Sequence, residues 1–107
     1  MIRQISAAEL KDRLLAGEDA PFLLDVREPQ EFAYCRIEGA MSIPLGELPR
    51  RSRELPDGRE IVAICHHGMR SLQAAAFLRH TLALDVMNLQ GGVAAWAREV
   101  DPSMKQY

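Results

Sequence analysis

The most reactive group of residues in the chain is the stretch CHHGMRS at residues 65–71. Cys65 ends an apolar run, and a long, mostly apolar helical pattern follows the stretch. A cysteine that faces the N-terminus of a helix meets free N–H groups and a partial positive charge, which favour its thiolate. Because the thiolate is the nucleophilic form, the pattern predicts covalent chemistry at Cys65. The plainer interpretation is an inert core cysteine, since free cysteine is among the most buried residue types.

The residues after Cys65 have the chemistry of an anion-binding loop. Gly68 lets the backbone curl so that successive N–H groups point inward. Arg70 adds a fixed cation, and Ser71 is expected to cap the next helix. His66 and His67 either raise the local positive potential or lie on the rim of the loop. We therefore expect the loop to hold an anionic sulfur and an oxyanion together.

Short apolar runs alternate with helical patterns, and these elements must position the loop. The expected strands are residues 2–5, 22–26, 40–43, 61–65 and 85–89. The expected helices are residues 7–17 behind a Ser6 capping box, 29–34, 72–82, and 93–98 after a Gly91–Gly92 turn. Alternating β and α elements predict one α/β domain, residues 1–107, with a parallel sheet covered on both faces. Residues 49–60, rich in charge and turn formers, are interpreted as a solvated connection.

Sites in parallel sheets form where strands end and loops lead into helices. The Cys65 loop has this location, and so does Asp25-Val26-Arg27 after the second expected strand. An aspartate that ends a buried strand needs partners, which Arg27 and nearby N–H groups can supply.

Composition excludes several classes of protein. The chain has 107 residues, of which 48% are hydrophobic and 26% charged, a balance that excludes disorder, collagen and coiled coil. A net charge of -2 leaves no basic excess for nucleic acid. No apolar run approaches the roughly 20 residues of a membrane helix, and the N-terminus lacks a signal-peptide pattern, so we expect a cytoplasmic protein.

The cysteines and histidines do not form a metal or disulfide pattern. Cys35 and Cys65 are too few and too far apart for a disulfide scaffold. Together with His66, His67 and His80 they offer no second pair of ligands at zinc spacing. We expect no metal or other cofactor, and we expect His80 on a helix surface.

Three ordered signatures resemble those of single-domain rhodaneses, the thiosulfate sulfurtransferase-like family, over nearly the whole chain. They are LLDVREPQEFAYCRIEGAMSIPL at residues 23–45, CHHGMRS at 65–71 and NLQGGVAAW at 88–96. The resemblance implies a five-stranded parallel sheet flanked by helices, with Cys65 as the sulfur carrier. It also implies that the loop residues His66, His67, Gly68, Met69, Arg70 and Ser71 bind the substrate, their backbone N–H groups cradling a persulfide.

The resemblance also places supporting residues and shows one departure. The family's Asp-x-Arg pair falls on Asp25 and Arg27 and its later acid on Glu31, all expected to support the site structurally. Where the family commonly has Gly-His before an isoleucine, this chain has Cys35-Arg36. Cys35 is then either a resolving thiol or a packed small hydrophobic residue.

The implied reaction is a double displacement. Cys65 takes a sulfane sulfur from thiosulfate or another small donor, Arg70 orients the sulfonate, and a thiol, cyanide or a protein acceptor then removes the sulfur. A persulfide relay that serves a partner protein would keep the same cysteine and stays open. A cysteine-based phosphatase or arsenate reductase of related fold is disfavoured. Only four residues separate Cys65 from Arg70, one fewer than the phosphatases use.

Overall fold

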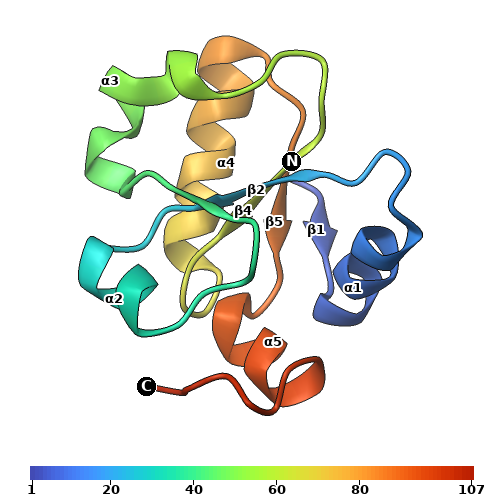
Figure 1. Ribbon diagram of the computed structural model, residues 1–107. Coiled ribbons are helices and arrows are strands. Elements are labelled where there is room, and N and C mark those ends of the chain that lie inside the picture. The colour runs from blue at the N-terminus through green and yellow to red at the C-terminus, as the bar shows by residue number, and fades with distance from the viewer.

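A five-stranded parallel sheet forms the centre of the computed structural model, which describes residues 1–107 (Figure 1). Its strands are β1 Gln4–Ile5, β2 Phe22–Asp25, β3 Met41–Ser42, β4 Ile61–Ile64 and β5 Val86–Leu89. They lie in the order β1-β5-β4-β2-β3, and every neighbouring pair is parallel. The predicted α/β class and parallel sheet are confirmed, and β4, which leads into Cys65, is the central strand.

Four α-helices lie between the strands, and a fifth follows the last strand. They are α1 Ala7–Ala16, α2 Pro29–Tyr34, α3 Leu48–Arg51, α4 Met69–Leu82 and α5 Gly92–Glu99. Residues at their N-termini favour the first two helices. At α1, Ser6 Oγ accepts a hydrogen bond from the Glu9 N–H at 3.1 Å in a capping box, and at α2, Pro29 occupies the first turn. None of the helices combines the length and the apolar character that crossing a membrane requires.

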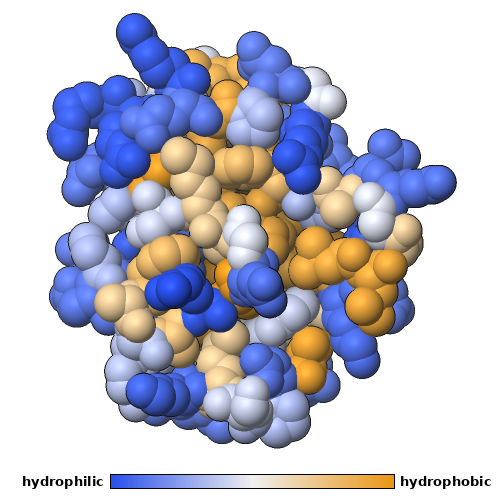
Figure 2. All heavy atoms as spheres, viewed as in Figure 1, coloured by the Kyte–Doolittle hydropathy of each residue, from blue (hydrophilic) through white to orange (hydrophobic).

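The sheet separates two apolar clusters because successive strand residues point to opposite faces. Val62 and Ile64 pack on one face with residues of α1 and α5. Ile61 and Ala63 pack on the other face with α4, whose buried residues include Leu78. Figure 2 shows hydrophobic residues near the middle of this view, while hydrophilic residues cover most of its rim.

Two expectations about the elements need correction. The helix expected at residues 72–82 begins at Met69, because Gly68 takes a left-handed conformation (φ 106°) and ends the loop earlier. The connection expected at residues 49–60 holds the end of α3 and a 3₁₀ turn at Ser52–Glu54. Leu55 is buried against the α4 side of the sheet, so this segment contributes to the core.

Candidate active site

Cys65 lies directly after β4, at the carboxyl end of the sheet, and is only 1% exposed. Its Sγ accepts a hydrogen bond from the Gly68 N–H at 3.1 Å and lies 3.2 Å from Ser71 Oγ. Donors aimed at the sulfur favour its negatively charged form. The position therefore combines a buried sulfur with two hydrogen-bonding groups at the start of a helix.

The loop backbone that follows Cys65 leaves several N–H donors free. Gly68 is the N-cap residue of the 14-residue helix α4. The N–H groups of the other loop residues donate to no protein acceptor, and these residues are His66, His67, Met69, Arg70 and Ser71. Unpaired N–H groups at a helix N-terminus make an anion-binding site. The structure thus gives the loop the donors that the sequence predicted.

The start of α5 holds this loop from the other side. Val93 N–H donates to the Cys65 carbonyl at 2.9 Å, and Ala94 N–H donates to the His66 carbonyl at 3.1 Å. Gly92 permits this approach: a Cβ there would lie 2.3 Å from the Cys65 carbonyl oxygen, and its φ is +59°. The sequence treated Gly92 as a turn residue, but its side-chain-free backbone also packs against the reactive loop.

Ser71 does not cap α4, which corrects its expected role. The side chain is fully buried in the first turn of the helix, between Cys65 Sγ and Asn88 Oδ1 on β5. A hydroxyl has one proton, so it donates either to a thiolate or to Asn88. When the cysteine is protonated, its S–H can donate to Oγ instead. The arrangement therefore serves both protonation states of the sulfur.

Asn88 is a site residue that the sequence analysis missed. Its Nδ2 donates to the Gly68 carbonyl at 3.1 Å and to Gln4 Oε1 at 2.9 Å. A buried side chain in the middle of an apolar strand needs such partners, and the asparagine in the NLQGGVAAW signature was the available signal. Asn88 fixes both the glycine of the loop and the hydroxyl beside the sulfur.

Arg70 is not a free cation. Its two terminal nitrogens donate to the Glu31 carboxylate at 2.7 and 2.9 Å, joining the loop to α2. These bonds, outweighing the effect of burial, lower the pKa of Glu31 to about 2. A guanidinium has five N–H donors, so the pair leaves donors for a further anion. The loop cation and the acid that the sequence had assigned to structural support act as one unit.

Asp25 and Arg27 form a second ion pair, and both side chains are fully buried. Asp25 Oδ2 accepts from Arg27 Nη2 at 2.7 Å, and Oδ1 accepts from the Arg27 backbone N–H at 3.0 Å. Arg27 Nη2 also donates to the Cys35 carbonyl at 2.6 Å. The partners expected for Asp25 are present, and they anchor the segment between β2 and α2.

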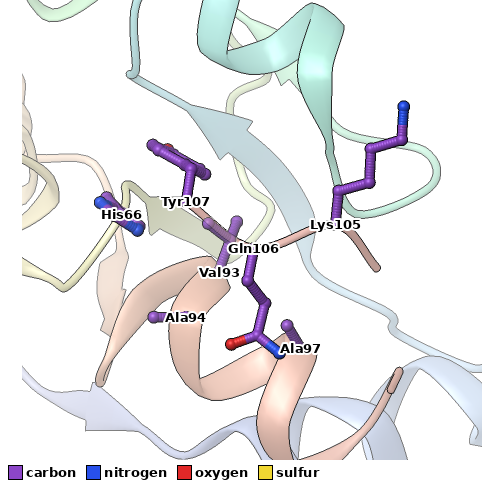
Figure 3. A pocket seen from close by; sticks show the side chains of 7 residues that line it. All are labelled: His66, Val93, Ala94, Ala97, Lys105, Gln106 and Tyr107. Carbon is purple, nitrogen blue, oxygen red and sulfur yellow. The ribbon is translucent and has the colours of Figure 1, made fainter. Parts of the chain in front are cut away.

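Tyr107 is the second site residue that the sequence analysis missed. Its ring stacks on His66, with centroids 3.8 Å apart and planes at 7°. Burial raises the pKa of the Tyr107 hydroxyl to about 12. Figure 3 shows the two rings beside α5. Together with residues of that helix they line a hollow of about 20 Å³. Tyr107 lies outside the three signatures, so no motif pointed to it.

The remaining loop side chains form its rim. His67 and Met69 are exposed, Met69 by 71%, while His66 is half-buried between His67 and Tyr107. Burial, and then electrostatic repulsion from His67, lower the pKa of His66, which disfavours the protonated ring. Of the two roles left open for the histidines, the structure favours the rim. His80 lies on the exposed face of α4, as expected.

Cys35 lies at the C-terminal end of α2 and is 8% exposed. It belongs to the apolar cluster on the α1 and α5 side of the sheet, whereas Cys65 belongs to the other cluster. Both cysteines are free. The geometry favours a packed small residue over a resolving thiol.

Comparison with known proteins finds rhodanese-like domains and sulfurtransferases. A family model described as a rhodanese-like domain matches residues 6–99. A sulfurtransferase of Allochromatium vinosum is 40% identical over 98 residues, covering 92% of this chain and 91% of that protein. The adenylyltransferase and sulfurtransferase MOCS3 of Drosophila ananassae is 34% identical over 93 residues, which cover 79% of this chain and 21% of MOCS3. The crystal structure of a rhodanese-related protein from Thermoplasma volcanium has a TM-score of 0.83 and 35% identity, covering 92% of this chain and 93% of that one.

Proposed function

The chain belongs to the rhodanese-like domain family, as its three signatures indicated, and from this membership we propose that Cys65 carries a sulfane sulfur as a persulfide. The protein is a rhodanese-domain sulfurtransferase or sulfur carrier. The observation that carries the proposal is the Cys65 sulfur itself, which lies within hydrogen-bonding distance of the Gly68 N–H and the Ser71 hydroxyl at the open N-terminus of α4.

The proposed first step loads the cysteine. The Cys65 thiolate attacks the outer sulfur of thiosulfate or of another sulfane donor. A new S–S bond forms, the donor's bond to its sulfane sulfur breaks, and sulfite, or the corresponding leaving group of another donor, departs with the bonding electron pair. The terminal sulfur on Cys65 carries the negative charge, and in this scheme the N–H groups of residues 66–71 stabilise it.

The second step transfers the sulfur from Cys65 to an acceptor. A thiol or cyanide attacks the terminal sulfur, the S–S bond to Cys65 breaks, and the thiolate is regenerated. Splitting the transfer into two displacements predicts ping-pong kinetics. In this scheme the guanidinium donors of Arg70 that Glu31 leaves unused orient the sulfonate oxygens, while Asp25, Arg27 and Glu31 hold the surrounding backbone.

A relay that delivers sulfur to a protein is the second candidate. The matched segment makes up only 21% of MOCS3, whose name combines adenylyltransferase and sulfurtransferase activities, so a related domain works there inside a larger protein. A protein acceptor would receive the sulfur from the same Cys65 persulfide. The two candidates therefore differ in the acceptor and in the rate of turnover with small molecules.

Intact-protein mass before and after incubation with thiosulfate tests the proposal. The wild-type protein and Cys35→Ala should gain the mass of one sulfur atom, and Cys65→Ala should gain none. Addition of cyanide should then remove the sulfur. Gain by Cys65→Ala would assign the chemistry to Cys35, and no gain by any variant would exclude thiosulfate as the donor.

The variant Arg70→Ala separates donor binding from sulfur carriage. Thiosulfate use should fall sharply, because the sulfonate loses its cation, while loading from an uncharged sulfane donor should fall much less. An equal fall with both donors would remove Arg70 from its proposed role. If Cys65 forms the persulfide but does not pass its sulfur to small thiols, the result would favour the relay.

A further inference from the structure

Tyr107 contacts three separate parts of the site, yet the sulfur transfer described above gives it no role. Its ring stacks on His66 of the reactive loop. Its hydroxyl donates to Glu31 Oε2 at 2.8 Å and accepts from Arg27 Nη1 at 2.9 Å. We propose that Tyr107 is a positioning residue that holds the Glu31–Arg70 pair in place beside the Cys65 sulfur, an inference that rests on the proposed function of Cys65.

The Glu31 carboxylate is held from several sides. Oε1 accepts from Arg70 Nη1 at 2.7 Å and from the Glu28 N–H at 2.9 Å. Oε2 is shared by Arg70 Nη2 at 2.9 Å and the Tyr107 hydroxyl. Without the hydroxyl, this oxygen would keep only Arg70, which is itself 36% exposed. The carboxylate and the guanidinium could then move together.

The hydroxyl also links the Glu31–Arg70 pair to a fully buried ion pair. Arg27, its donor, is fully buried and paired with Asp25. A continuous chain of hydrogen bonds therefore runs from Asp25 through Arg27, Tyr107 and Glu31 to Arg70. The chain thus ties the partly exposed Glu31–Arg70 pair to the fully buried Asp25–Arg27 pair.

The position of Arg70 matters at the sulfur. Arg70 lies in the first turn of α4, between Gly68 and Ser71, whose N–H and hydroxyl groups both reach Cys65 Sγ. An anionic reagent or donor that approaches the sulfur meets this cation. Loosening Arg70 should therefore weaken the capture of anions more than that of neutral molecules.

The variant Tyr107→Phe isolates the hydroxyl, because it keeps the ring that stacks on His66. Tyr34→Phe is the matched control. The ring of Tyr34 meets the ring of Tyr107 edge-on, with centroids 5.9 Å apart. The hydroxyl of Tyr34, unlike that of Tyr107, makes no hydrogen bond to another residue. Both variants remove one phenolic oxygen from neighbouring rings that are each 47% exposed.

The first measurement is the alkylation rate of Cys65 by iodoacetate and by iodoacetamide, with the modified cysteine located by peptide mass mapping. The ratio of the anionic to the neutral rate should fall about threefold or more in Tyr107→Phe, as expected for losing a hydrogen bond to a charged group. It should stay unchanged in Tyr34→Phe. This readout requires no sulfur transfer.

The second measurement is single-turnover persulfide formation against thiosulfate concentration. The half-saturating concentration should rise about threefold or more in Tyr107→Phe, while the limiting rate changes little. In a Glu31→Ala background, the further change Tyr107→Phe should have no effect, because the residue acts through that carboxylate. If Tyr107 only stabilised the fold, Tyr107→Phe would lower the melting temperature. It would not raise the half-saturating concentration at an unchanged limiting rate, and its effect would not depend on Glu31.

The outcomes separate this inference from the proposed function. An alkylation ratio in Tyr107→Phe equal to that of the wild type overturns the inference, and so does a full effect in the Glu31→Ala background. If the wild type forms no persulfide from thiosulfate but the ratio falls in Tyr107→Phe, the donor is wrong and the role of Tyr107 stands.

Discussion

Cys65 and Cys35 are both free and both buried, yet their surroundings prepare them for different roles. The Cys65 sulfur lies within reach of an N–H group and a hydroxyl at the start of a 14-residue helix. The Cys35 sulfur lies 3.7 Å from Arg27 Nη1 at the end of the six-residue helix α2. The charge of that guanidinium is already balanced by Asp25.

Burial therefore does not distinguish a nucleophile from a packing residue in this protein. The useful difference is the supply of donors that no other group has taken. The loop after Cys65 keeps free N–H groups, whereas Arg27, which donates to the Cys35 sulfur at 3.7 Å, also donates to Asp25, Tyr107 and backbone carbonyls. Unsatisfied donors around a sulfur favour negative charge there, and satisfied ones do not.

The largest expected effect comes from the packing of the start of α5 against the loop that follows Cys65. Gly92→Ala would force a Cβ against the Cys65 carbonyl, so we expect it to lower the free energy of unfolding by about 3 kcal/mol or more. Gly39, in the segment after Cys35, also has a positive φ but nothing lies within 4 Å of an added Cβ. Gly39→Ala should cost only about 1 kcal/mol.

Urea unfolding of the two glycine variants checks this prediction. Persulfide formation by whatever folded Gly92→Ala remains should be impaired, because the loop carbonyls must move. Equal losses of stability in the two variants would contradict the close packing of α5 on the reactive loop.

An intermediate effect is expected at the hydroxyl beside the sulfur. Ser71→Ala removes a donor from the thiolate and leaves Asn88 Oδ1 without that partner. Persulfide formation at Cys65 should slow about tenfold, and stability should fall by about 1 kcal/mol. The rate is measured by quenched-flow mass spectrometry. Alkylation of Cys35 in the same variant, which should not change, serves as the internal control.

The smallest effect concerns Glu31, which touches both regions: its carbonyl accepts the Cys35 N–H at 3.1 Å and its carboxylate holds Arg70. Because the pKa of Glu31 is lowered from 4.5 to about 2, its stabilisation is present above about pH 4.5 and is lost as the pH falls toward 2. Arg70 is 36% exposed, so solvent screening limits the gain to about 1 kcal/mol or less.

Urea unfolding of the wild type and Glu31→Gln at neutral pH and in steps down to about pH 3 measures this contribution. The difference between the two should be greatest at neutral pH and should shrink below about pH 4.5. A difference that grows as the pH falls would reverse the sign and contradict the lowered pKa.

Much of the fold followed from local patterns. The Ser6 capping box, Pro29 and the apolar run before Cys65 each placed an element within a few residues of its observed bounds. The errors arose where tertiary contacts decide. Leu55 is buried within a charged stretch, and Gly68 starts a helix whose apolar pattern is obvious only from Leu72.

The sequence alone determined the order of the elements along the chain and the place of Cys65 at the carboxyl end of a strand, because periodicity, caps and turns depend on neighbouring residues. Only the tertiary structure decided which groups meet at the site. Ser71 reaches Asn88, Arg70 reaches Glu31, and Tyr107 reaches Glu31 across 17, 39 and 76 residues of chain. A hydrogen bond requires its atoms to lie within a few tenths of an ångström of the right distance, and only the packed helices and sheet set that distance.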